Sequence, residues 1–374
     1  MKVTLENVTK KFPSRTKNSP DVIAVNKFDF EFPDGKLIAL LGPSGFGKST
    51  TLNLISGLLK ATEGKVFFGD DDVTELAAEK RGVGLVFQNY ALYPHLTVRQ
   101  NILFPLQNLR GKDKMSKTEM NSKAEEIARL VQVDKLMERK PNELSGGQQQ
   151  RVAISRALVK MTKVLLLDEP LSNLDARLRL QTREEIRRIQ KETRITTVFV
   201  THDQDEAMSI SDMIVVMRDG VVHQTGLPQE VYDNPDNLFV AQFLGTPPIS
   251  VFDGTVKDGS LYIGNDKVLD GVYADNADVT VGIRPEGYIL KEDGALCCKL
   301  RTVEVMGRDI SVVSSNDFAK SADIRSIISS ENKVDTSKEY VRFNLRREKV
   351  FLFDKENGKR IRFCSEKGGI ENNG

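Results

Sequence analysis

A short glycine-rich segment near the N-terminus carries residue types that bind phosphate. It fits the pattern G-x-x-x-x-G-K-[ST] and runs through Gly42, Pro43, Ser44, Gly45, Phe46, Gly47, Lys48, Ser49 and Thr50. Glycines let main-chain N–H groups curl around phosphate oxygens, and the N-terminus of a following helix adds positive potential. At this spacing Lys48 reaches the β- and γ-phosphates of a nucleotide, and the Ser49 hydroxyl binds Mg²⁺. Phe46 is bulky for such a loop, but the loop acts through its main chain, so we expect it to be tolerated.

Two acids at the end of an apolar run supply further groups that nucleotide hydrolysis needs. Residues 164–167 are Val-Leu-Leu-Leu, and Asp168 and Glu169 follow directly. We predict that Asp168 holds Mg²⁺ through a water molecule and that Glu169 polarises the attacking water. Residues 26–29 match the Asn-Lys-x-Asp pattern that reads guanine, but they precede the glycine-rich segment and lie inside an alternating strand. Guanine-reading proteins place this pattern later in the chain, so we interpret the match as accidental.

The N-terminal segments that flank the glycine-rich segment read as strands. Residues 1–12 and 22–41 carry strand patterns, separated by a polar loop over residues 13–21. In the second segment three aromatic residues alternate with acids and form one apolar face: Phe28, Phe30 and Phe32. Residues 34–35 are Asp-Gly, which predicts a tight hairpin turn.

Buried strands then alternate with helices. Residues 37–41 read as a buried strand that enters the glycine-rich segment. The next helix is expected to carry four apolar residues on one face: Leu52, Ile55, Leu58 and Leu59. The pattern is mainly helical over residues 90–150, where Ser116 and Glu119 predict a capping box. Further buried strands lie over residues 164–167 and 197–200, and this alternation predicts a parallel α/β sheet.

The character of the chain changes after residue 236. Short strand patterns alternate with turn signals at Asp258-Gly259, Gly264-Asn265, Gly307 and Asn357-Gly358. We therefore predict an α/β nucleotide-binding domain over residues 1–235, with a helical subdomain at about 90–150, and a small all-β domain over residues 236–374. The last few residues are expected to be disordered.

Composition excludes several classes of protein. The 374 residues carry 54 basic and 53 acidic side chains, without the basic excess that a nucleic-acid binder shows. The apolar runs are far shorter than the ~20 residues that span a bilayer, and the N-terminus lacks a signal-peptide pattern. We therefore expect no nucleic-acid partner, no direct insertion into lipid, and a role at a membrane only through a protein partner. The cysteines fit no zinc or redox spacing and are expected to be reduced thiols of a cytosolic protein: Cys297, Cys298 and Cys364.

A further motif lies between Leu144 and Gln148. Its sequence, Leu-Ser-Gly-Gly-Gln, resembles the signature sequence of ABC ATPases and opens a predicted helix through Leu158. In that family the signature faces the γ-phosphate bound by the other subunit. The resemblance implies that four residues contact ATP across a homodimer interface: Ser145, Gly146, Gly147 and Gln148. One chain would then hold half of each composite site, with Ser145 and Gly147 donating hydrogen bonds.

Other segments match the family's motifs in the expected order. Gln88 resembles the glutamine of the Q-loop, which senses nucleotide, contributes to holding Mg²⁺ and contacts the membrane subunit. Asp175 resembles the aspartate of the D-loop at the dimer interface, and His202 resembles the switch histidine that contacts the γ-phosphate. Phe12 matches the aromatic residue that stacks on adenine. The resemblance thus implies ATP and Mg²⁺ as cofactors, with Lys48, Gln88, Glu169 and His202 as catalytic residues and Ser49, Gln88 and Asp168 as metal ligands.

Longer matches resemble the ATPases of maltose and multiple-sugar importers. They cover residues 88–98, 146–154, 243–248 and 282–286, and the resemblance spans nearly the whole chain. It implies a P-loop NTPase domain followed by an OB-like regulatory domain. It also implies a homodimer that powers two integral-membrane permease subunits at the cytoplasmic face of the cell membrane. An extracytoplasmic solute-binding protein would deliver the solute, expected to be an oligosaccharide or a glycerol-phosphate type of carbohydrate.

Two alternatives stay open at this point. Importers of polyamine, sulfate or iron share much of this pattern, so these solutes are an alternative to a carbohydrate. A soluble ABC ATPase that acts on DNA or ribosomes is a more distant alternative. Such proteins carry long coiled coils or two ATPase units in one chain, and this sequence has neither.

Overall fold

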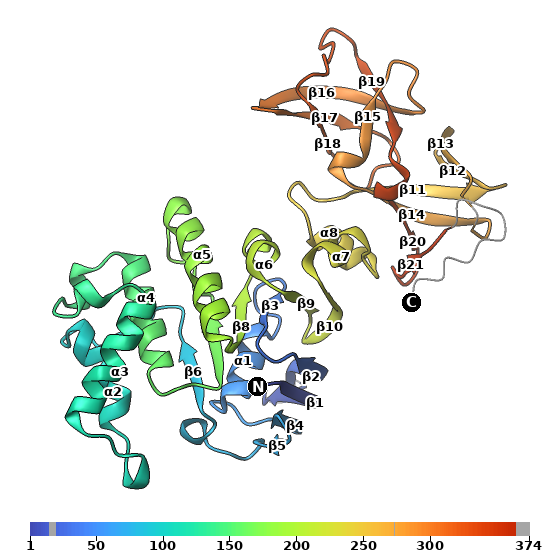
Figure 1. The fold of residues 1–374 in the computed structure, drawn as a ribbon. Coiled ribbons are helices and arrows are strands. Elements are labelled where there is room, and N and C mark those ends of the chain that lie inside the picture. The colour runs from blue at the N-terminus through green and yellow to red at the C-terminus, as the bar shows by residue number, and fades with distance from the viewer. Residues whose placement is uncertain (15–19, 273, 364–374) are drawn as a thin grey trace. The chain divides into compact units, whose positions relative to one another are not determined.

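The computed structural model describes residues 1–14, 20–272 and 274–363. The chain divides into two compact units, Met1–Gln229 and Glu230–Gly374, which are described separately (Figure 1). Most of the predicted polar loop, the predicted disordered tail and Cys364 lie outside the described residues.

The first unit contains two β-sheets. An antiparallel sheet has the strand order β2-β1-β4-β5, and a larger sheet has the order β10-β9-β3-β8-β7-β6. In the larger sheet the strands from β9 to β6 are parallel, as predicted, and β10 is antiparallel to β9. The strands are β1 (Val3–Phe12), β2 (Val22–Phe32), β3 (Leu37–Leu41), β4 (Glu63–Phe68), β5 (Asp71–Asp72), β6 (Val83–Val86), β7 (Val164–Asp168), β8 (Thr196–Thr201), β9 (Met213–Arg218) and β10 (Val221–Gly226).

The core of this unit lies between the two sheets. All residues of β3 and β8 are buried without alternation, which is typical of a parallel strand covered on both faces. One hydrophobic cluster joins both sheets to the helix α1 (Lys48–Ser56), and it includes Leu5, Phe28, Phe32, Leu40, Leu52, Ile55 and Val198. Each such buried side chain stabilises the fold by roughly 1.5–3 kcal/mol. The helices α5 (Ala176–Thr193) and α6 (Gln204–Ile210) follow β7 and β8.

Three further helices lie together beside β6 at one end of the first unit (Figure 1). They are α2 (Val98–Gln107), α3 (Lys117–Leu130) and α4 (Gly146–Leu158), and each begins with a capping box. The predicted capping box at Ser116 and the predicted helix from the signature to Leu158 are both confirmed. Short 3₁₀ turns occur at Ala78–Lys80, Gly111–Asp113, Asp134–Leu136 and Pro141–Glu143.

Two local predictions are wrong. The helix α1 ends at Gly57, whose φ of 81° closes it with a left-handed cap, so Leu58 and Leu59 both lie beyond the helix, and Leu58 is 51% exposed. The turn at residues 34–35 exists but joins no hairpin, because β2 pairs with β1 whereas β3 pairs with β8 and β9. This turn instead carries the chain from one sheet to the other.

The second unit is built almost entirely of strands. Two short helices, α7 (Pro228–Asp233) and α8 (Leu238–Phe243), lead into it. One antiparallel sheet has the order β13-β12-β11-β14-β20-β21 and the other has the order β15-β19-β16-β17-β18. The strands are β11 (Ser250–Lys257), β12 (Ser260–Ile263), β13 (Asp266–Asp270), β14 (Ala277–Ile283), β15 (Tyr288–Leu290), β16 (Leu296–Met306), β17 (Asp309–Ser315), β18 (Ile324–Ser329), β19 (Tyr340–Leu345), β20 (Val350–Asp354) and β21 (Arg360–Ile361), with 3₁₀ turns at Pro285–Gly287 and Arg347–Lys349.

The turn signals of the second half lie where these strands join. Asp258-Gly259 connects β11 to β12, and Gly307 connects β16 to β17, each with positive φ. The prediction of an all-β domain is therefore confirmed. The core of this unit draws on both sheets and includes Phe252, Leu261, Val281, Phe343 and Leu352.

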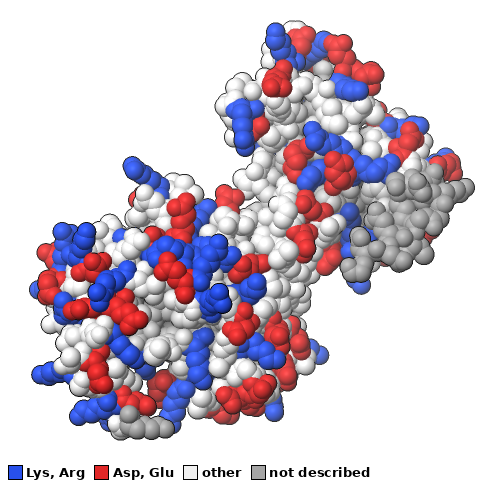
Figure 2. All heavy atoms as spheres, in the orientation of Figure 1, with Lys and Arg blue, Asp and Glu red and all other residues white. Residues whose placement is uncertain are grey.

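Surface features agree with the composition. Basic and acidic side chains are interspersed on the face drawn in Figure 2, as the balanced charge predicts. No helix in the described ranges is both long enough and apolar enough to cross a membrane. Cys297 and Cys298 are free thiols, and burial raises the pKa of Cys298 to about 12.

Candidate functional site

The predicted site residues converge on one edge of the parallel sheet. Four strands end there: β3 before the phosphate loop (residues 42–47), β6 before Gln88, β7 at Asp168 and β8 before His202. The register keeps these ends level, since the last residue of β3 pairs with the last residue of β8. Segments far apart in sequence therefore meet, as they do at the carboxyl edges of open parallel sheets.

Two glycines of the phosphate loop occupy positions that no side chain can fill. A Cβ atom on Gly42 would lie 2.2 Å from the carbonyl oxygen of Met217. Gly47 has a φ of 89°, and a Cβ atom there would lie 2.1 Å from the carbonyl oxygen of Ala24. Both contacts involve main-chain atoms, so the path of the loop depends on glycine at its two ends. Gly47 is also the N-cap of α1, which places the helix N-terminus directly after the loop.

Lys48 is tethered to the phosphate loop. Only 4% of its surface is exposed, and Nζ donates to the carbonyl oxygens of Gly42 at 2.8 Å and Pro43 at 2.7 Å. Burial lowers the pKa of Lys48 from its ordinary value, while the charges of Glu169 and Asp168 oppose this shift. The ammonium group is thus held between the loop and the two acids that end β7.

Ser49 and Asp168 form the pair of oxygen donors that a magnesium site needs. The Ser49 hydroxyl donates to Oδ1 of Asp168 at 2.8 Å. Burial raises the pKa of Asp168, and the hydrogen bond from Ser49 opposes this shift. Hydroxyl and carboxylate oxygens suit Mg²⁺, which usually takes one or two protein ligands together with phosphates and water. No group of three or more His, Cys, Asp or Glu side chains within the described residues forms a separate metal site.

Glu169 joins three of the predicted motifs. Gln88 Nε2 donates to Oε2 of Glu169 at 3.0 Å, and Nδ1 of His202 lies 3.3 Å from Oε1. Gln88 Nε2 also donates to the hydroxyl oxygen of Ser172 at 3.2 Å. Glu169 has a φ of 43°, and its N–H group donates to the Val200 carbonyl oxygen at 3.1 Å. Such a main-chain conformation costs roughly 1–3 kcal/mol and is concentrated at functional sites.

The predicted D-loop, residues 172–175, contacts the predicted Q-loop residue Gln88. Asn173 Nδ2 donates to the main-chain oxygen of Gln88 at 2.9 Å. Asp175 is the N-cap of α5, where Oδ1 accepts a hydrogen bond from the N–H group of Leu178 at 3.0 Å. The structure therefore fixes Asp175 at a helix N-terminus close in sequence to the acids of β7.

Within the described residues, neither the signature residues nor Phe12 forms a hydrogen bond with Lys48, Gln88 or Glu169. Ser145 is the N-cap of α4, and its N–H group donates to Oε1 of Gln148 at 2.9 Å. No hydrogen bond within the described part of the chain joins residues 145–148 to the phosphate loop. Phe12 ends β1, with Lys10 Nζ at 5.3 Å from its ring centroid. A Cβ atom on Gly146 would lie 2.7 Å from Cδ2 of Leu174, so the signature packs beside the predicted D-loop although no hydrogen bond among the described residues joins it to the phosphate loop.

One supporting residue was missed by sequence reasoning. Arg156, near the end of α4, donates through Nη2 to the Tyr90 carbonyl oxygen at 2.9 Å and through Nη1 to that of Ala91 at 2.6 Å. Both acceptor residues have positive φ, 61° and 46°. Burial lowers the pKa of Arg156. The sequence gives no signal for this contact, because the acceptors are main-chain atoms 65 and 66 residues away.

An ion-pair cluster follows His202, the predicted switch histidine, and was also missed by sequence reasoning. Asp203 caps α6 and lies 3.4 Å from Arg179 and 3.6 Å from Arg183. Glu206 is buried and accepts a hydrogen bond from the Thr201 hydroxyl at 2.6 Å. Burial raises the pKa of Glu206, with a smaller contribution in the same direction from Asp203. These contacts connect the residues on both sides of His202 to α5.

Comparisons with known proteins show the family to which the chain is similar. The family model described as ABC transporter matches residues 25–172. The sn-glycerol-3-phosphate import ATP-binding protein UgpC of Ruegeria pomeroyi is 38% identical over 360 residues, which cover 96% of this chain and 99% of that protein. The diacetylchitobiose uptake system ATP-binding protein MsiK of Streptomyces coelicolor is 44% identical over 297 residues, covering 78% of this chain and 76% of the relative.

A solved structure shows the same fold for the first part of the chain. It is a dimeric post-hydrolysis state of the ATP-binding cassette MJ0796 bound to ADP and Pi. It matches with a TM-score of 0.53 and 34% identity, covering 60% of this chain and 98% of that one. The UgpC protein of Ruegeria pomeroyi, at 38% identity, is aligned with 96% of this chain and therefore spans both units. The chain belongs to the ABC transporter family as one of its ATP-binding subunits.

Proposed function

We propose that this ABC ATPase binds and hydrolyses MgATP as a homodimer to power the import of a carbohydrate or a glycerol phosphate. The observation that carries the chemistry is the position of Glu169, whose carboxylate contacts both Gln88 and His202. The adjacent residue, Asp168, holds the hydroxyl of Ser49 at the start of α1. A water-activating carboxylate and a metal-binding pair are thereby set side by side at the end of β7.

The nucleotide would be held mainly by its phosphates. Main-chain N–H groups of residues 42–50 and the N-terminus of α1 favour negative charge, and Lys48 adds a full positive charge. Phe12 would stack on adenine. Ser49 and Asp168 would hold Mg²⁺, assisted by Gln88, and the metal would neutralise charge on the phosphate oxygens.

Glu169 would then orient and polarise the water that attacks the γ-phosphorus. A new phosphorus–oxygen bond forms as the bond to the β–γ bridging oxygen breaks, so ADP and phosphate are released. Gln88 and His202 would hold the Glu169 carboxylate in position, and His202 would also contact the γ-phosphate. Positioning and charge stabilisation carry the rate in reactions of this type.

The separation of the signature from the phosphate loop supports a composite site. Residues 145–148 would contact the ATP held by a second copy of the chain, and Asp175 would lie at the interface. The solved cassette MJ0796 is described as a dimer, which supports this assembly. Closure on ATP and opening after hydrolysis would follow from the higher affinity of ATP for the closed dimer.

A groove in the first unit offers a surface for permease subunits. Its volume is about 940 Å³, and its lining includes Leu85, Tyr93, Phe104, Leu109 and Arg156. Arg156 also holds the main chain just after Gln88, so a helix seated in this groove would sense the Q-loop. We infer that one helix from each of two permease subunits docks here, at the cytoplasmic face of the membrane, and that an extracytoplasmic binding protein delivers the solute.

The solute class rests on the relatives. Their names assign them to sn-glycerol-3-phosphate import and diacetylchitobiose uptake, and a third relative, from Haloferax volcanii, to xylose/arabinose import. These names favour a carbohydrate over the polyamine, sulfate or iron alternatives. The choice itself would be made by the permease and the binding protein.

Two experiments test the proposal. Lys48→Ala should abolish tight MgATP binding measured by fluorescent-nucleotide titration, and unchanged affinity would contradict the phosphate assignment. Affinity purification of the tagged chain from detergent-solubilised native membranes should recover polytopic permease subunits, whose binding protein can be screened against sugars, polyamines, sulfate and iron. Recovery of ribosomal or DNA-associated proteins without a permease would leave the ATPase standing and overturn the import role.

A further inference from the structure

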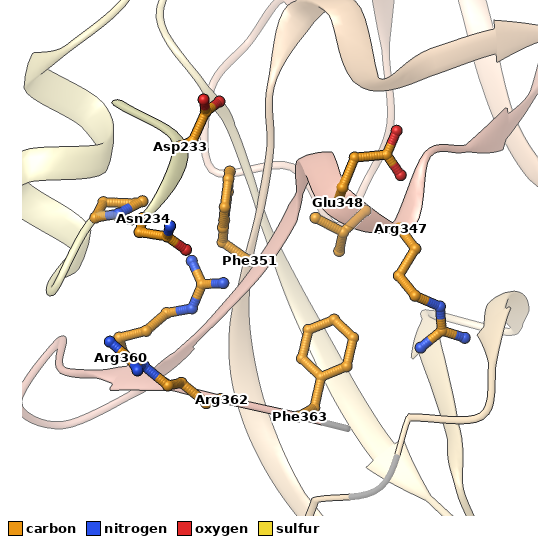
Figure 3. A pocket seen from close by; sticks show the side chains of 10 residues that line it. Asp233, Asn234, Arg347, Glu348, Phe351, Arg360, Arg362 and Phe363 are labelled. Carbon is orange, nitrogen blue, oxygen red and sulfur yellow. The ribbon is translucent and has the colours of Figure 1, made fainter. Parts of the chain in front are cut away.

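A pocket in the second unit is lined by three arginines and two phenylalanines (Figure 3). Its volume is about 320 Å³, at the lower end of the range for small-molecule sites. The arginines are Arg347, Arg360 and Arg362, and the phenylalanines are Phe351 and Phe363. Every lining residue belongs to Glu230–Gly374, so the pocket is complete within one unit.

Arg360 is the unusual member of this set. Its Nε and Nη1 atoms are buried and have no hydrogen-bond partner within the described residues. Its guanidinium carbon lies 4.3 Å from the ring centroid of Phe351 and 5.7 Å from that of Phe353. Stacking on rings offsets part of the cost of burying a cation, but it leaves the N–H donors unused. Buried charges in proteins are normally paired.

Neighbouring positive charges increase this imbalance. Burial, together with the charges of Arg362 and Arg284, lowers the pKa of Arg360 to about 9, so it is still cationic at neutral pH. Arg362 is exposed and lies two residues after Arg360. The guanidinium of Arg347 is occupied by the carbonyl oxygens of Asp270 and Gly271.

The acids of the pocket do not neutralise these charges. The carboxylate of Asp233 is bound by Lys349, with 2.8 Å between Oδ1 and Nζ. Figure 3 shows the carboxylate of Glu348 turned away from Arg360 and Phe363. Asp236 opposes the lowering of the Arg360 pKa through its charge, but it leaves Nε and Nη1 of Arg360 without a hydrogen-bond partner among the described residues. The pocket thus presents buried N–H donors that an added oxyanion could use.

We propose that this pocket binds a phosphate-type oxyanion, either free or as the phosphoryl group of a small metabolite. Guanidinium groups match phosphate oxygens with paired N–H donors, and such charge-assisted hydrogen bonds are among the strongest in proteins. Arg360 and Arg362 hold the anion, and the rings of Phe351 and Phe363 border the space left for a small organic body. The site does not depend on ATP hydrolysis or import, because none of its residues belongs to the edge of the parallel sheet.

The test is isothermal titration of inorganic phosphate into the full-length chain carrying Lys48→Ala, which weakens competing binding at the phosphate loop. Arg360→Gln and Arg362→Gln, added singly, are each expected to weaken phosphate binding about 10- to 100-fold, the effect of losing charge-assisted hydrogen bonds. Arg308→Gln is the matched control, since it removes an exposed arginine of the same unit that forms an ion pair with its neighbour Asp309 and does not line the pocket. It should leave the affinity unchanged.

Glucose 6-phosphate, titrated in the same way, separates the two sources of the anion. Tighter binding than inorganic phosphate assigns the site to a phosphorylated metabolite, and equal or weaker binding assigns it to the free anion. The proposal is overturned if neither compound binds the Lys48→Ala chain, or if the Arg362 and Arg308 variants bind alike. Arg362 is exposed, so this comparison holds even if Arg360→Gln fails to fold.

Discussion

The guanidinium of Arg156 donates to the main-chain oxygen of Ala91, with 2.6 Å between Nη1 and O. Its Nη2 atom donates to the oxygen of Tyr90, so one side chain holds two consecutive residues of left-handed conformation. Each non-glycine residue in this region costs roughly 1–2 kcal/mol relative to ordinary main chain. Arg156 therefore stabilises a strained turn directly after Gln88, which contacts Glu169.

Replacing Arg156 should slow hydrolysis more than it weakens nucleotide binding. Without the guanidinium the turn at Tyr90 and Ala91 relaxes, and Gln88 no longer holds Glu169 in place. We expect Arg156→Gln to lower single-turnover ATP hydrolysis about 10- to 100-fold, the scale of a small misplacement at an active site, with MgATP affinity nearly unchanged. Arg129→Gln, an exposed arginine on α3, is the control.

A second substitution separates positioning from a general loss of stability. Ala91→Gly accommodates positive φ without steric cost, so it should recover part of the hydrolysis lost in Arg156→Gln. Normal turnover in Arg156→Gln, or an equal loss of nucleotide affinity, would contradict a positioning role.

Glu169→Gln should trap the ATP-bound state. The amide keeps the shape of the side chain but polarises water poorly, so hydrolysis should fall by roughly 10²–10⁴, or about 3–5 kcal/mol. Light scattering with MgATP should then show a stable dimer. A variant that is monomeric with ATP would count against the composite site, and a variant with unaltered turnover would count against Glu169 as the activating base.

Ser145→Arg tests whether the signature acts on the partner's nucleotide. The bulky cation should block hydrolysis, while MgATP still binds the phosphate loop of the same chain with normal affinity. The measurements are nucleotide titration on the monomer and turnover at dimer-forming concentrations. Mixing this chain with a Lys48→Ala chain should restore one functional composite site in each mixed dimer. Loss of nucleotide binding by the isolated variant monomer would contradict an action across the interface.

Glu206 should make stability depend on pH. Its folded pKa lies above the ordinary value of 4.5, chiefly through burial, so the folded state binds this proton more tightly than the unfolded chain. The free energy of unfolding should therefore fall as pH rises from 4.5 through the folded pKa. Glutamine does not titrate, so the Glu206→Gln variant should lose less stability over this pH interval. Its thermal midpoint should therefore rise relative to that of the wild type as the pH increases. Glu184→Gln, on the exposed face of α5, is the control, and the difference between its thermal midpoint and that of the wild type should not change with pH. If the difference for Glu206→Gln is also independent of pH, the raised pKa of Glu206 is refuted.

Much of the site can be predicted because its chemistry is local in sequence. The phosphate loop and the acids after β7 follow buried strands, and parallel strands bring their carboxyl ends together whatever the connections between them. The roles of Gln88, Asp175 and His202 were predicted from resemblance to a family, because a single polar residue forms no sequence pattern of its own. The contact of Glu169 with both Gln88 and His202 then follows from the strand order.

The errors and omissions arise where distant atoms decide the outcome. The apolar spacing places Leu58 on a helical face, but Gly57 ends the helix first. An Asp-Gly turn has the same local chemistry in a hairpin as in a crossing between sheets, and only the remote pairing partners of β2 and β3 distinguish them. Arg156 and Arg360 cannot be read from the sequence for the same reason. Their partners, or their lack of partners, exist only in the folded chain.

The capping box at the signature has a consequence for molecular recognition. The Ser145 oxygen accepts a hydrogen bond from the N–H group of Gln148, and the Gln148 side chain accepts from the N–H group of Ser145. A hydroxyl that accepts in this way still has its own proton to donate. In the proposed dimer, the group that recognises phosphate is oriented before the ligand arrives, so closure loses little side-chain entropy at this position. The same hydroxyl starts α4, so a change at Ser145 should be detectable twice, as a less stable monomer and as a weaker dimer.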